Sequence, residues 1–300
     1  MGAVKRDRSR LVIVTGASSG IGQETARLFA RAGWDCLAGV RSADARRAWI
    51  AEGTTDRAIA RHVVPVTLDV TDEADRAGVV REVSARGGKL NALINAAGIS
   101  SPGAFAFGDA ESDREVIETN LLGPMALARN LVPALREGAN DASNPAGGSI
   151  IVNVASIAGI APMPWQSTYH AAKFGFVGWS DAVGHELRHD GIHLVAVLPG
   201  TVRTPMLEKA DHLLDASIRR LPRIAPKPYF RGLTRFRRSA QLAARFAATP
   251  NVVAKAIVDL ASRKNPPARV IIGADAHVLR AVVAFLPHRF AMAVLGGVLS

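Results

Sequence analysis

The fold is decided by Leu11-Val12-Ile13-Val14-Thr15-Gly16-Ala17-Ser18-Ser19-Gly20-Ile21-Gly22. The first four residues are apolar and mostly β-branched, which predicts a short buried strand. An amphipathic stretch from Gln23 to Ala32 follows and predicts a helix. The order is therefore strand, glycine-rich turn and helix.

Each glycine of this turn has a separate physical use. Gly16 permits a tight turn, Gly20 lets the backbone approach a pyrophosphate, and Gly22 lets the helix pack against the strand. The start of the helix adds free N–H groups and the positive end of its dipole. The glycines are spaced G-x-x-x-G-x-G rather than G-x-G-x-x-G, and the flanking strand and helix favour a dinucleotide site over a plain loop.

Further apolar runs alternate with helix-like segments along the chain. This alternation predicts a parallel, doubly wound, Rossmann-type α/β sheet of seven strands in a single domain. The 300 residues, 48% of them hydrophobic, suffice for one large core. The expected strands after the first are Cys36 to Val40, Val63 to Leu68, Leu90 to Asn95, Ser149 to Val154, Ile192 to Leu198 and Arg269 to Ile272.

A tyrosine and a lysine four residues apart, Tyr169 and Lys173, lie on one face of a predicted helix. An ammonium in this position would lower the pKa of the phenol, which is ordinarily about 10, and so make Tyr169 a proton carrier. Ser156 lies thirteen residues before Tyr169, just past a predicted strand, where it could hydrogen-bond the same substrate oxygen. This combination favours an enzyme.

Seven elements in this order resemble the single-domain short-chain dehydrogenase/reductase family, roughly over residues 11 to 205 and 250 to 273. They are Thr15 to Gly22, Leu68-Asp69-Val70, Asn95-Ala96-Ala97-Gly98, Asn120, Ser156, Tyr169 with Lys173, and Pro199-Gly200-Thr201-Val202-Arg203-Thr204. Ala96 departs from the asparagine that the family often carries there, but keeps the side chain small.

The resemblance implies a hydride-transferring oxidoreductase that acts on a carbonyl or secondary alcohol. Its catalytic residues would be Asn120, Ser156, Tyr169 and Lys173, with Asn120 holding a water that links Lys173 to solvent. The implied cofactor-binding residues are Gly16, Ser18, Ser19, Gly20, Ile21, Gly22, Arg41, Asp69, Val70, Asn95, Ala96, Ala97, Gly98, Tyr169, Lys173, Pro199, Gly200, Val202 and Thr204.

The end of the second predicted strand indicates the form of the cofactor. Gly39-Val40-Arg41-Ser42 places no carboxylate there to accept hydrogen bonds from a ribose, whereas Arg41 could accommodate a 2′-phosphate. NADP(H) is therefore favoured, and NAD(H) stays open as the alternative. By resemblance, Asp69 would bind the adenine amino group.

Residues 201–250 form a basic segment, predicted to be a lid over the substrate, with eleven Lys and Arg against three Asp and Glu. Much of the formal net charge of +11 resides here. The segment could meet an anionic membrane or an acidic carrier substrate, or could simply present solvated arginines. Nucleic-acid binding is not expected, because no recognition fold is evident.

The chain is divided into a basic N-terminal extension (1–10), the main domain (11–273) and an apolar C-terminal tail (274–300). Neither apolar stretch of the tail reaches the roughly 20 residues of a spanning helix. The tail could pack on the core, cover a dimer surface or dip into a bilayer interface. Peripheral membrane contact would favour a lipophilic substrate of steroid, retinoid or fatty-acyl type. A cytoplasmic location and a homo-oligomer are expected.

Two alternatives belong to other functional classes. His185-Glu186-Leu187-Arg188-His189 matches the H-E-x-x-H pattern of zinc hydrolases, but no further ligand is evident, so no metal is expected. A protein that senses a dinucleotide without turnover would not need Ser156, Tyr169 and Lys173 together. Cys36 is the single cysteine, lies in a predicted strand and permits no intramolecular disulfide.

Overall fold

A computed structural model describes residues 10–141, 144 and 146–299, so most of the predicted N-terminal extension lies outside the described residues. Seven parallel strands form one sheet, as the sequence predicts, and the strand order is β3-β2-β1-β4-β5-β6-β7. The strands are β1 (Leu11–Val14), β2 (Asp35–Val40), β3 (Val63–Thr67), β4 (Ala92–Asn95), β5 (Ser149–Val154), β6 (Ile192–Pro199) and β7 (Arg269–Ile272). The ends of β1, β5 and β7 are the predicted ones, and the other four strands each differ at one end by one or two residues.

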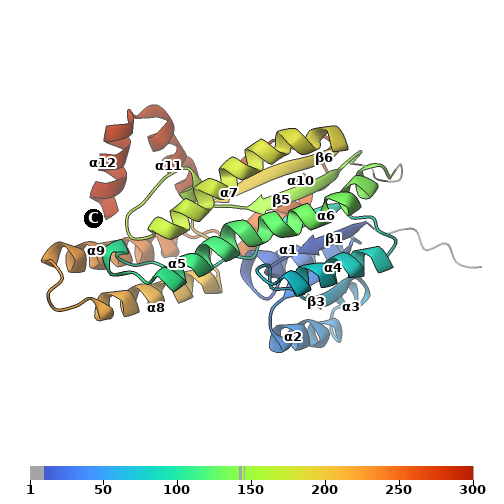
Figure 1. The fold of residues 1–300 in the computed structure, drawn as a ribbon, viewed down its shortest axis with the longest axis horizontal. Coiled ribbons are helices and arrows are strands. Elements are labelled where there is room, and N and C mark those ends of the chain that lie inside the picture. The colour runs from blue at the N-terminus through green and yellow to red at the C-terminus, as the bar shows by residue number, and fades with distance from the viewer. Residues whose placement is uncertain (1–9, 142–143, 145, 300) are drawn as a thin grey trace, which may run out of the picture.

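Helices cover both faces of this sheet (Figure 1). One face is packed by α1 (Gly20–Arg31) and α10 (Pro250–Leu260), with α2 (Ala43–Gly53) and α3 (Arg57–His62) beside them. The other is packed by α4 (Glu73–Ala85), α6 (Gly123–Ala139) and α7 (Ser167–Glu186). The remaining elements are α5 (Ala110–Ile117), the 3-10 turns η1 (Phe105–Phe107), η3 (Ile157–Gly159) and η4 (Leu187–Asp190), and the π-helical η2 (Glu118–Leu122).

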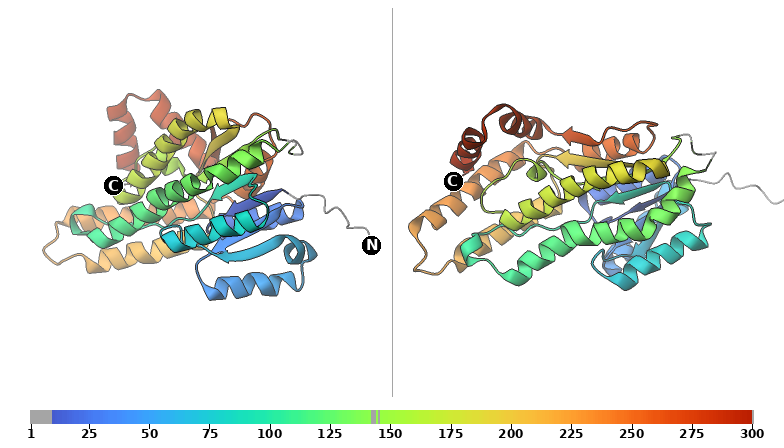
Figure 2. Two further views of the ribbon diagram at one scale, coloured as in Figure 1. Left: turned by 45° about the vertical axis from the view of Figure 1, so that its right-hand side comes forward. Right: turned by 45° about the horizontal axis from the view of Figure 1, so that its top comes forward.

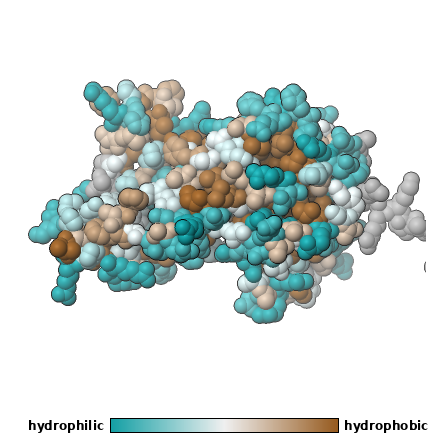
Figure 3. All heavy atoms as spheres, in the orientation of Figure 1, coloured by the Kyte–Doolittle hydropathy of each residue, from teal (hydrophilic) through white to brown (hydrophobic). Residues whose placement is uncertain are grey.

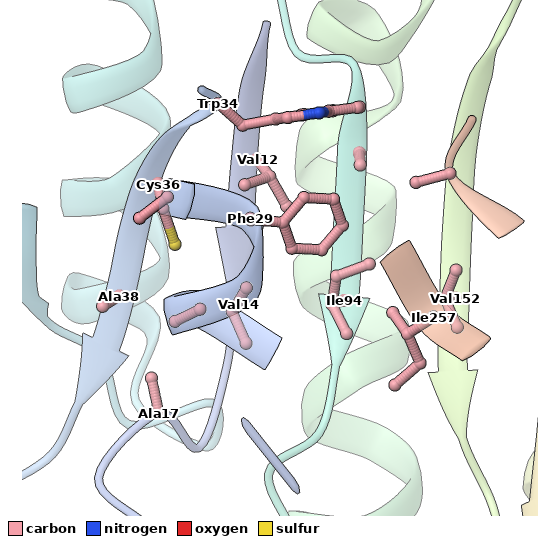
Figure 4. Close-up of a cluster of buried hydrophobic side chains, with 14 of the residues drawn as sticks. Val12, Val14, Ala17, Phe29, Trp34, Cys36, Ala38, Ile94, Val152 and Ile257 are labelled. Atoms are coloured by element: carbon pink, nitrogen blue, oxygen red, sulfur yellow. The ribbon is translucent and has the colours of Figure 1, made fainter. Parts of the chain in front are cut away.

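The two cores follow from the alternation of side chains along each strand. Val12 and Val14 of β1 belong to the core under α1, whereas Leu11 and Ile13 belong to the core on the opposite face. Figure 4 shows the first core, where Phe29 lies above the sheet; its ring meets that of Trp34 edge to face with centroids 5.0 Å apart. Both faces of β1 are buried, which explains why its sequence is a continuous apolar run.

The strand order places the candidate site. Because β1 is flanked by β2 and β4, the chain connections leave β1 and β4 toward opposite faces of the sheet, and a crevice opens at their carboxyl ends. The segments after β1, β4, β5 and β6 all begin at this edge. They carry most of the predicted site residues, whereas Arg41 follows β2, and Asp69 and Val70 follow β3.

Two helix pairs extend beyond the sheet at the end of the molecule opposite the first described residue (Figures 1 and 2). The basic segment forms α8 (Pro205–Arg220) and α9 (Lys227–Arg245), and the apolar tail forms α11 (Ala274–Phe285) and α12 (His288–Leu299). Arg237 of α9 links this helix to α8. Its Nε lies 2.9 Å from the Asp211 carboxylate and its Nη1 lies 2.6 Å from the Asp215 carboxylate, both on α8. Three of the segment's charges therefore hold the two helices together.

Candidate active site

The glycine-rich turn after β1 depends on backbone approaches that a side chain would prevent. Gly16 has φ of +64°, and a Cβ there would lie 2.8 Å from the backbone of Ala97. A Cβ on Gly22 would lie 2.4 Å from the carbonyl oxygen of Gly16. Gly20 also has a positive φ, of +57°, and faces Thr204 across the turn. The turn thus brings the segments after β1, β4 and β6 together.

The start of α1 has the properties of an anion site. Its N-cap residue, Ser19, makes no side-chain capping hydrogen bond, and its first turn holds no acidic residue. The helices α2 to α5, by contrast, are each capped by their own side chain, from Ser42, Asp56, Asp72 and Asp109. The free N–H groups and dipole of α1 fit a pyrophosphate. Ser18 and Ile21 lie in the same turn.

The ends of β1 and β4 are joined by one hydroxyl group. Thr15 Oγ1 accepts hydrogen bonds of 3.0 Å from the N–H groups of both Ala96 and Ala97. Asn95 is 2% exposed, and its Nδ2 donates to Asn153 Oδ1 at 2.8 Å. Its own Oδ1 has no partner among the described residues. The side chain of Asn95 therefore supports the sheet beneath the site.

Arg41 lies just past the end of β2, with more than half of its side chain exposed. Its guanidinium is 3.9 Å from the carboxylate of Asp69, which follows β3. Asp69 Oδ1 also accepts hydrogen bonds from the N–H and hydroxyl of Thr71, at 2.9 and 2.7 Å. Such an exposed ion pair is weak and opens readily for an incoming anion. Val70 is buried beside them.

The segment after β6 is fixed by a carboxylate from the start of α11. Asp275 accepts a hydrogen bond of 2.6 Å from the Thr201 N–H, and a Cβ on Gly200 would lie 2.0 Å from the same carboxylate. Val202 pairs with Ala248 as an isolated bridge. Pro199 ends β6, and the segment reaches Thr204 opposite the glycine turn. No motif in the sequence indicates this role of Asp275.

Asn120 lies in the π-helical turn η2. Its side chain is 1% exposed and pairs twice with Ile99: Oδ1 accepts from the Ile99 N–H, and Nδ2 donates to the Ile99 carbonyl, both at 2.8 Å. Gly98 lies against this amide. The extra residue in the π-helical turn is a feature frequent at functional sites, and a helical periodicity cannot reveal it.

Ser156, Tyr169 and Lys173 come together between the end of β5 and the first two turns of α7. Ser156 caps η3, its Oγ accepting from the Ala158 N–H at 3.1 Å. The ammonium of Lys173 lies 5.7 Å from the centre of the Tyr169 ring and donates to the Val154 carbonyl at 3.0 Å. Two hydroxyls and an ammonium thus converge on one small region.

Burial dominates the protonation of this group. It lowers the pKa of Lys173 to about 8, because this residue is only 4% exposed. It also raises the pKa of Tyr169, which a hydrogen bond with Ser156 partly opposes. The lowering of the Tyr169 pKa expected from Lys173 is therefore not found, because desolvation of the phenolate is the larger effect. At neutral pH, Tyr169 keeps its proton and Lys173 its charge.

The sequence analysis missed His170, whose buried imidazole ties the Ser156 loop to α7. Its Nδ1 is 2.8 Å from the Ala158 carbonyl, and its Nε2 accepts from the Met163 N–H at 3.1 Å. These partners require the neutral tautomer with the proton on Nδ1, and burial lowers the pKa of His170 accordingly. The only sequence signal was its position next to Tyr169.

The residues of the H-E-x-x-H pattern, His185 to His189, do not lie on one regular α-helix. His185 and Glu186 end α7, whereas His189 lies in the 3-10 turn η4. The i,i+4 spacing of an α-helix, which would bring both imidazoles to one ion, is lost there. Among the described residues, no group of three His, Cys, Asp or Glu side chains could hold a metal.

Comparisons with known proteins agree with this geometry. Residues 10–214 match the family model for short chain dehydrogenases. The chain is 32% identical over 218 residues to the 3-oxoacyl-[acyl-carrier-protein] reductase FabG of Thermotoga maritima, covering 72% of this chain and 84% of that protein. It is 33% identical over 203 residues to dehydrogenase/reductase SDR family member 7B of Bos taurus, where the match covers 66% of this chain and only 59% of the relative.

Solved structures share the fold. A variant of the actinorhodin polyketide ketoreductase solved with NADPH superposes with a TM-score of 0.70 and 27% identity, covering 89% of this chain and 95% of that one. A short-chain dehydrogenase from Streptomyces avermitilis gives a TM-score of 0.73, with 24% identity and 92% of both chains covered.

The burial of Lys173 predicts a conflict between stability and function. Below pH 8 the folded protein carries a desolvated ammonium; between about pH 8 and 10.5 the folded state loses this proton before the unfolded state does, so stability rises with pH. We expect Lys173→Met to raise the free energy of unfolding at pH 7 by roughly 1–3 kcal/mol. Urea unfolding at pH 7 and 9.5 measures this, and a gain that does not shrink at pH 9.5 would contradict it.

Proposed function

The chain belongs to the short-chain dehydrogenase family, and we propose that it transfers a hydride between NADP(H) and a carbonyl or secondary alcohol of a lipophilic substrate. The observation that carries the proposal is the convergence of Ser156, Tyr169 and Lys173 beside an uncapped helix start. The names of the relatives, among them reductases of oxoacyl and polyketide substrates, support the carbonyl reaction.

The residues of the chain would divide the work as follows. A bound reduced nicotinamide would supply the hydride. Tyr169, whose raised pKa keeps it protonated at neutral pH, would donate its hydroxyl proton to the carbonyl oxygen, while Ser156 hydrogen-bonds that oxygen. Lys173 would hold ribose hydroxyls, and its ammonium would stabilise the Tyr169 phenolate that remains after the proton is transferred. Asn120, already paired with Ile99, would position a water toward Lys173.

NADP(H) is the proposed form of the cofactor because a cation, and no carboxylate, follows β2 directly. Arg41 is exposed, and its nearest anionic partner, Asp69, is 3.9 Å away, so a 2′-phosphate could replace that contact at little cost. A relative solved with NADPH supports the same choice. NAD(H) remains the competing cofactor.

A lipophilic substrate is favoured by a cavity of about 350 Å³ between α8, α9 and the segments after β4 and β6. It includes Thr204, opposite the glycine turn, and Gln166, at the start of α7. Leu207, Leu214 and Phe236 give it apolar walls. Polar residues also line it, namely Arg203, Glu208, Asp211, His212 and Gln241. These helices form the lid proposed over the substrate.

Peripheral contact with an anionic membrane is the proposed partner interaction. Phe285 is 85% exposed and Phe290 49% exposed at the turn between α11 and α12, and the Arg289 guanidinium lies 4.5 Å from the Phe290 ring centre. This pair of helices projects from the body and mixes apolar and hydrophilic surface (Figure 3). Aromatic side chains beside cations are suited to a headgroup boundary.

The opposite side of the tail packs on the protein. Ala276 and Leu295 are buried against Ile157 and Ala161 of the loop that follows Ser156. In the described chain, no helix is both long and apolar enough to cross a bilayer. We propose a cytoplasmic, homo-oligomeric protein; the exposed Leu122 and Phe174 on neighbouring helices support self-association.

The catalytic proposal predicts that Tyr169→Phe keeps NADPH affinity and lowers turnover of lipophilic ketones by about 10²–10⁴-fold, because only the transferable proton is removed. Fluorescence titration and NADPH oxidation measure the two quantities. Retention of most activity would refute the assigned role. If the wild-type protein binds NADPH but reduces no carbonyl compound, the result would favour a protein that senses the dinucleotide without turnover.

The cofactor proposal predicts that Arg41→Ala weakens NADPH binding at least tenfold, about 1.4 kcal/mol, and leaves NADH binding nearly unchanged. The cause would be loss of the cation at the 2′-phosphate. Arg47→Ala is the matched control, since this exposed arginine on α2 pairs with Asp44 instead. Equal losses for the two cofactors in Arg41→Ala would exclude phosphate recognition.

The membrane proposal predicts that Phe285→Ser with Phe290→Ser reduces co-flotation with anionic vesicles at least tenfold, through loss of buried apolar area. The substitutions are preferable to removal of the tail, because removal would also uncover the Ser156 loop. Ile50→Ser, at an exposed site on α2, is the control. If the Phe285/Phe290 double variant and the Ile50→Ser control float with the vesicles equally well, the C-terminal tail is not the part of the protein that contacts the membrane.

A further inference from the structure

A second and larger cavity, of about 620 Å³, opens beside the start of α7. Three segments form it: the loop around η1, the approach to α7 and the first turns of α9. None of the predicted catalytic or cofactor residues lines it. The lining residues are Gly103, Phe105, Ala106, Pro164, Trp165, Ser167, Pro228, Tyr229, Arg231, Gly232 and Arg235; we refer to this space as the aromatic cavity.

The walls of the aromatic cavity are built from rings that support one another. The Tyr229 ring meets the Trp165 ring at 6.0 Å and the Phe107 ring at 5.1 Å, both edge to face. Phe105, 78% exposed, stands at the rim. Offset and edge-to-face packing leaves room for a further flat ring. The walls thus suit an aromatic or fused-ring body.

The charge of the aromatic cavity has one sign. Arg231 and Arg235 are four residues apart on α9, so both lie on the same face of the helix, and no acidic residue is among the lining residues. Within the described chain, no carboxylate pairs with Arg231. Arg237, on another side of α9, does pair with a carboxylate, that of Asp211. A guanidinium at the edge of an apolar space favours a carboxylate, sulfonate or phosphate.

Trp165 is held in a conformation that its sequence does not favour. Its φ is +70°, which is rare for a bulky residue, and its carbonyl accepts from the Gly103 N–H at 2.8 Å. A Cβ on Gly232 would lie 2.2 Å from the indole, so only glycine permits this packing. The indole Nε1 is buried without a partner in the described chain. Such costs are typically retained where a side chain serves a site.

The aromatic cavity is lined in part by the segment that joins Ser156 to Tyr169. Pro164, Trp165 and Ser167 of this segment are among its lining residues, and Ser167 begins α7 two residues before Tyr169. A substrate whose carbonyl lies at Tyr169 could place its other end in the aromatic cavity if its body spanned the start of α7.

We infer that the aromatic cavity binds the end of the substrate remote from the reacting carbonyl, and that this end is an aromatic or fused-ring group bearing an anion. The Trp165 and Tyr229 rings hold the flat body, and Arg231 holds the anion. The identification with a substrate rests on the proposed function; the binding of an aromatic anion does not.

The binding is tested with 1-anilinonaphthalene-8-sulfonate and its neutral analogue N-phenyl-1-naphthylamine, with excess NADPH present to occupy the cofactor cleft. We expect the wild-type protein to bind the sulfonate at least fivefold more tightly than the neutral analogue. Arg231→Gln should weaken the sulfonate at least fivefold and leave the neutral analogue unchanged. Arg238→Gln, an exposed site on α9 outside the cavity lining, is the matched control and should change neither.

A second variant reports on the walls instead of the charge. In Gly232→Ala the new Cβ displaces the indole of Trp165, so binding of both probes should fall by a similar factor; near-ultraviolet circular dichroism shows whether the variant is folded. Equal affinity of the two probes for the wild-type protein, or equal losses in Arg231→Gln and Arg238→Gln, would overturn the inference.

Turnover separates this inference from the proposed function. An aromatic ketone with a distal carboxylate should have a higher kcat/KM than its methyl ester, and Arg231→Gln should remove the difference through KM. If neither ketone is reduced while the sulfonate still binds through Arg231, the proposed function fails and the anion site stands. If both are reduced equally and the sulfonate shows no preference, only the anion site fails.

Discussion

The closeness of the turn after β1 to the segment after β4 is the constraint on which the rest depends. Gly16 approaches Ala97 too closely for any side chain, and Thr15 binds two backbone N–H groups of that segment with one hydroxyl. This contact lies at the crevice where the strand order reverses. It also fixes the direction in which α1 presents its uncapped start, so the place of the proposed pyrophosphate site follows from the sheet topology.

The candidate catalytic groups are held by burial at the expense of stability. A desolvated Lys173, a protonated Tyr169 and a neutral His170 all lie within one helix turn of each other on α7. His170 ties the Ser156 loop to this helix, and the tail helices cover the same loop from outside. The C-terminal helices, more than a hundred positions away in the chain, therefore support the loop that begins at Ser156.

The basic segment is not electrically uniform once it is folded. Arg237 joins α8 and α9 through Asp211 and Asp215, and Arg219 also pairs with Asp215. Arg231 lies beside aromatic rings with no carboxylate partner in the described residues. Arg237 and Arg219 thus belong to ion pairs of α8 and α9, whereas Arg231 stays available for the anion that we propose. A net charge calculated from the sequence counts paired and unpaired arginines alike. Whether an arginine is paired depends on which helices pack together in the fold.

The sequence by itself determined the α/β class, the seven strands and the family. These follow from local patterns: an apolar run of strand length, glycines where the backbone must turn, and Tyr169 four residues before Lys173. Only the tertiary structure decided the π-helical turn at Asn120, the clamp of Asp275 on Thr201, the raised pKa of Tyr169 and the positive φ of Trp165. Each of these depends on burial or on contact between segments far apart in the chain, and neither quantity is carried by spacing along the sequence.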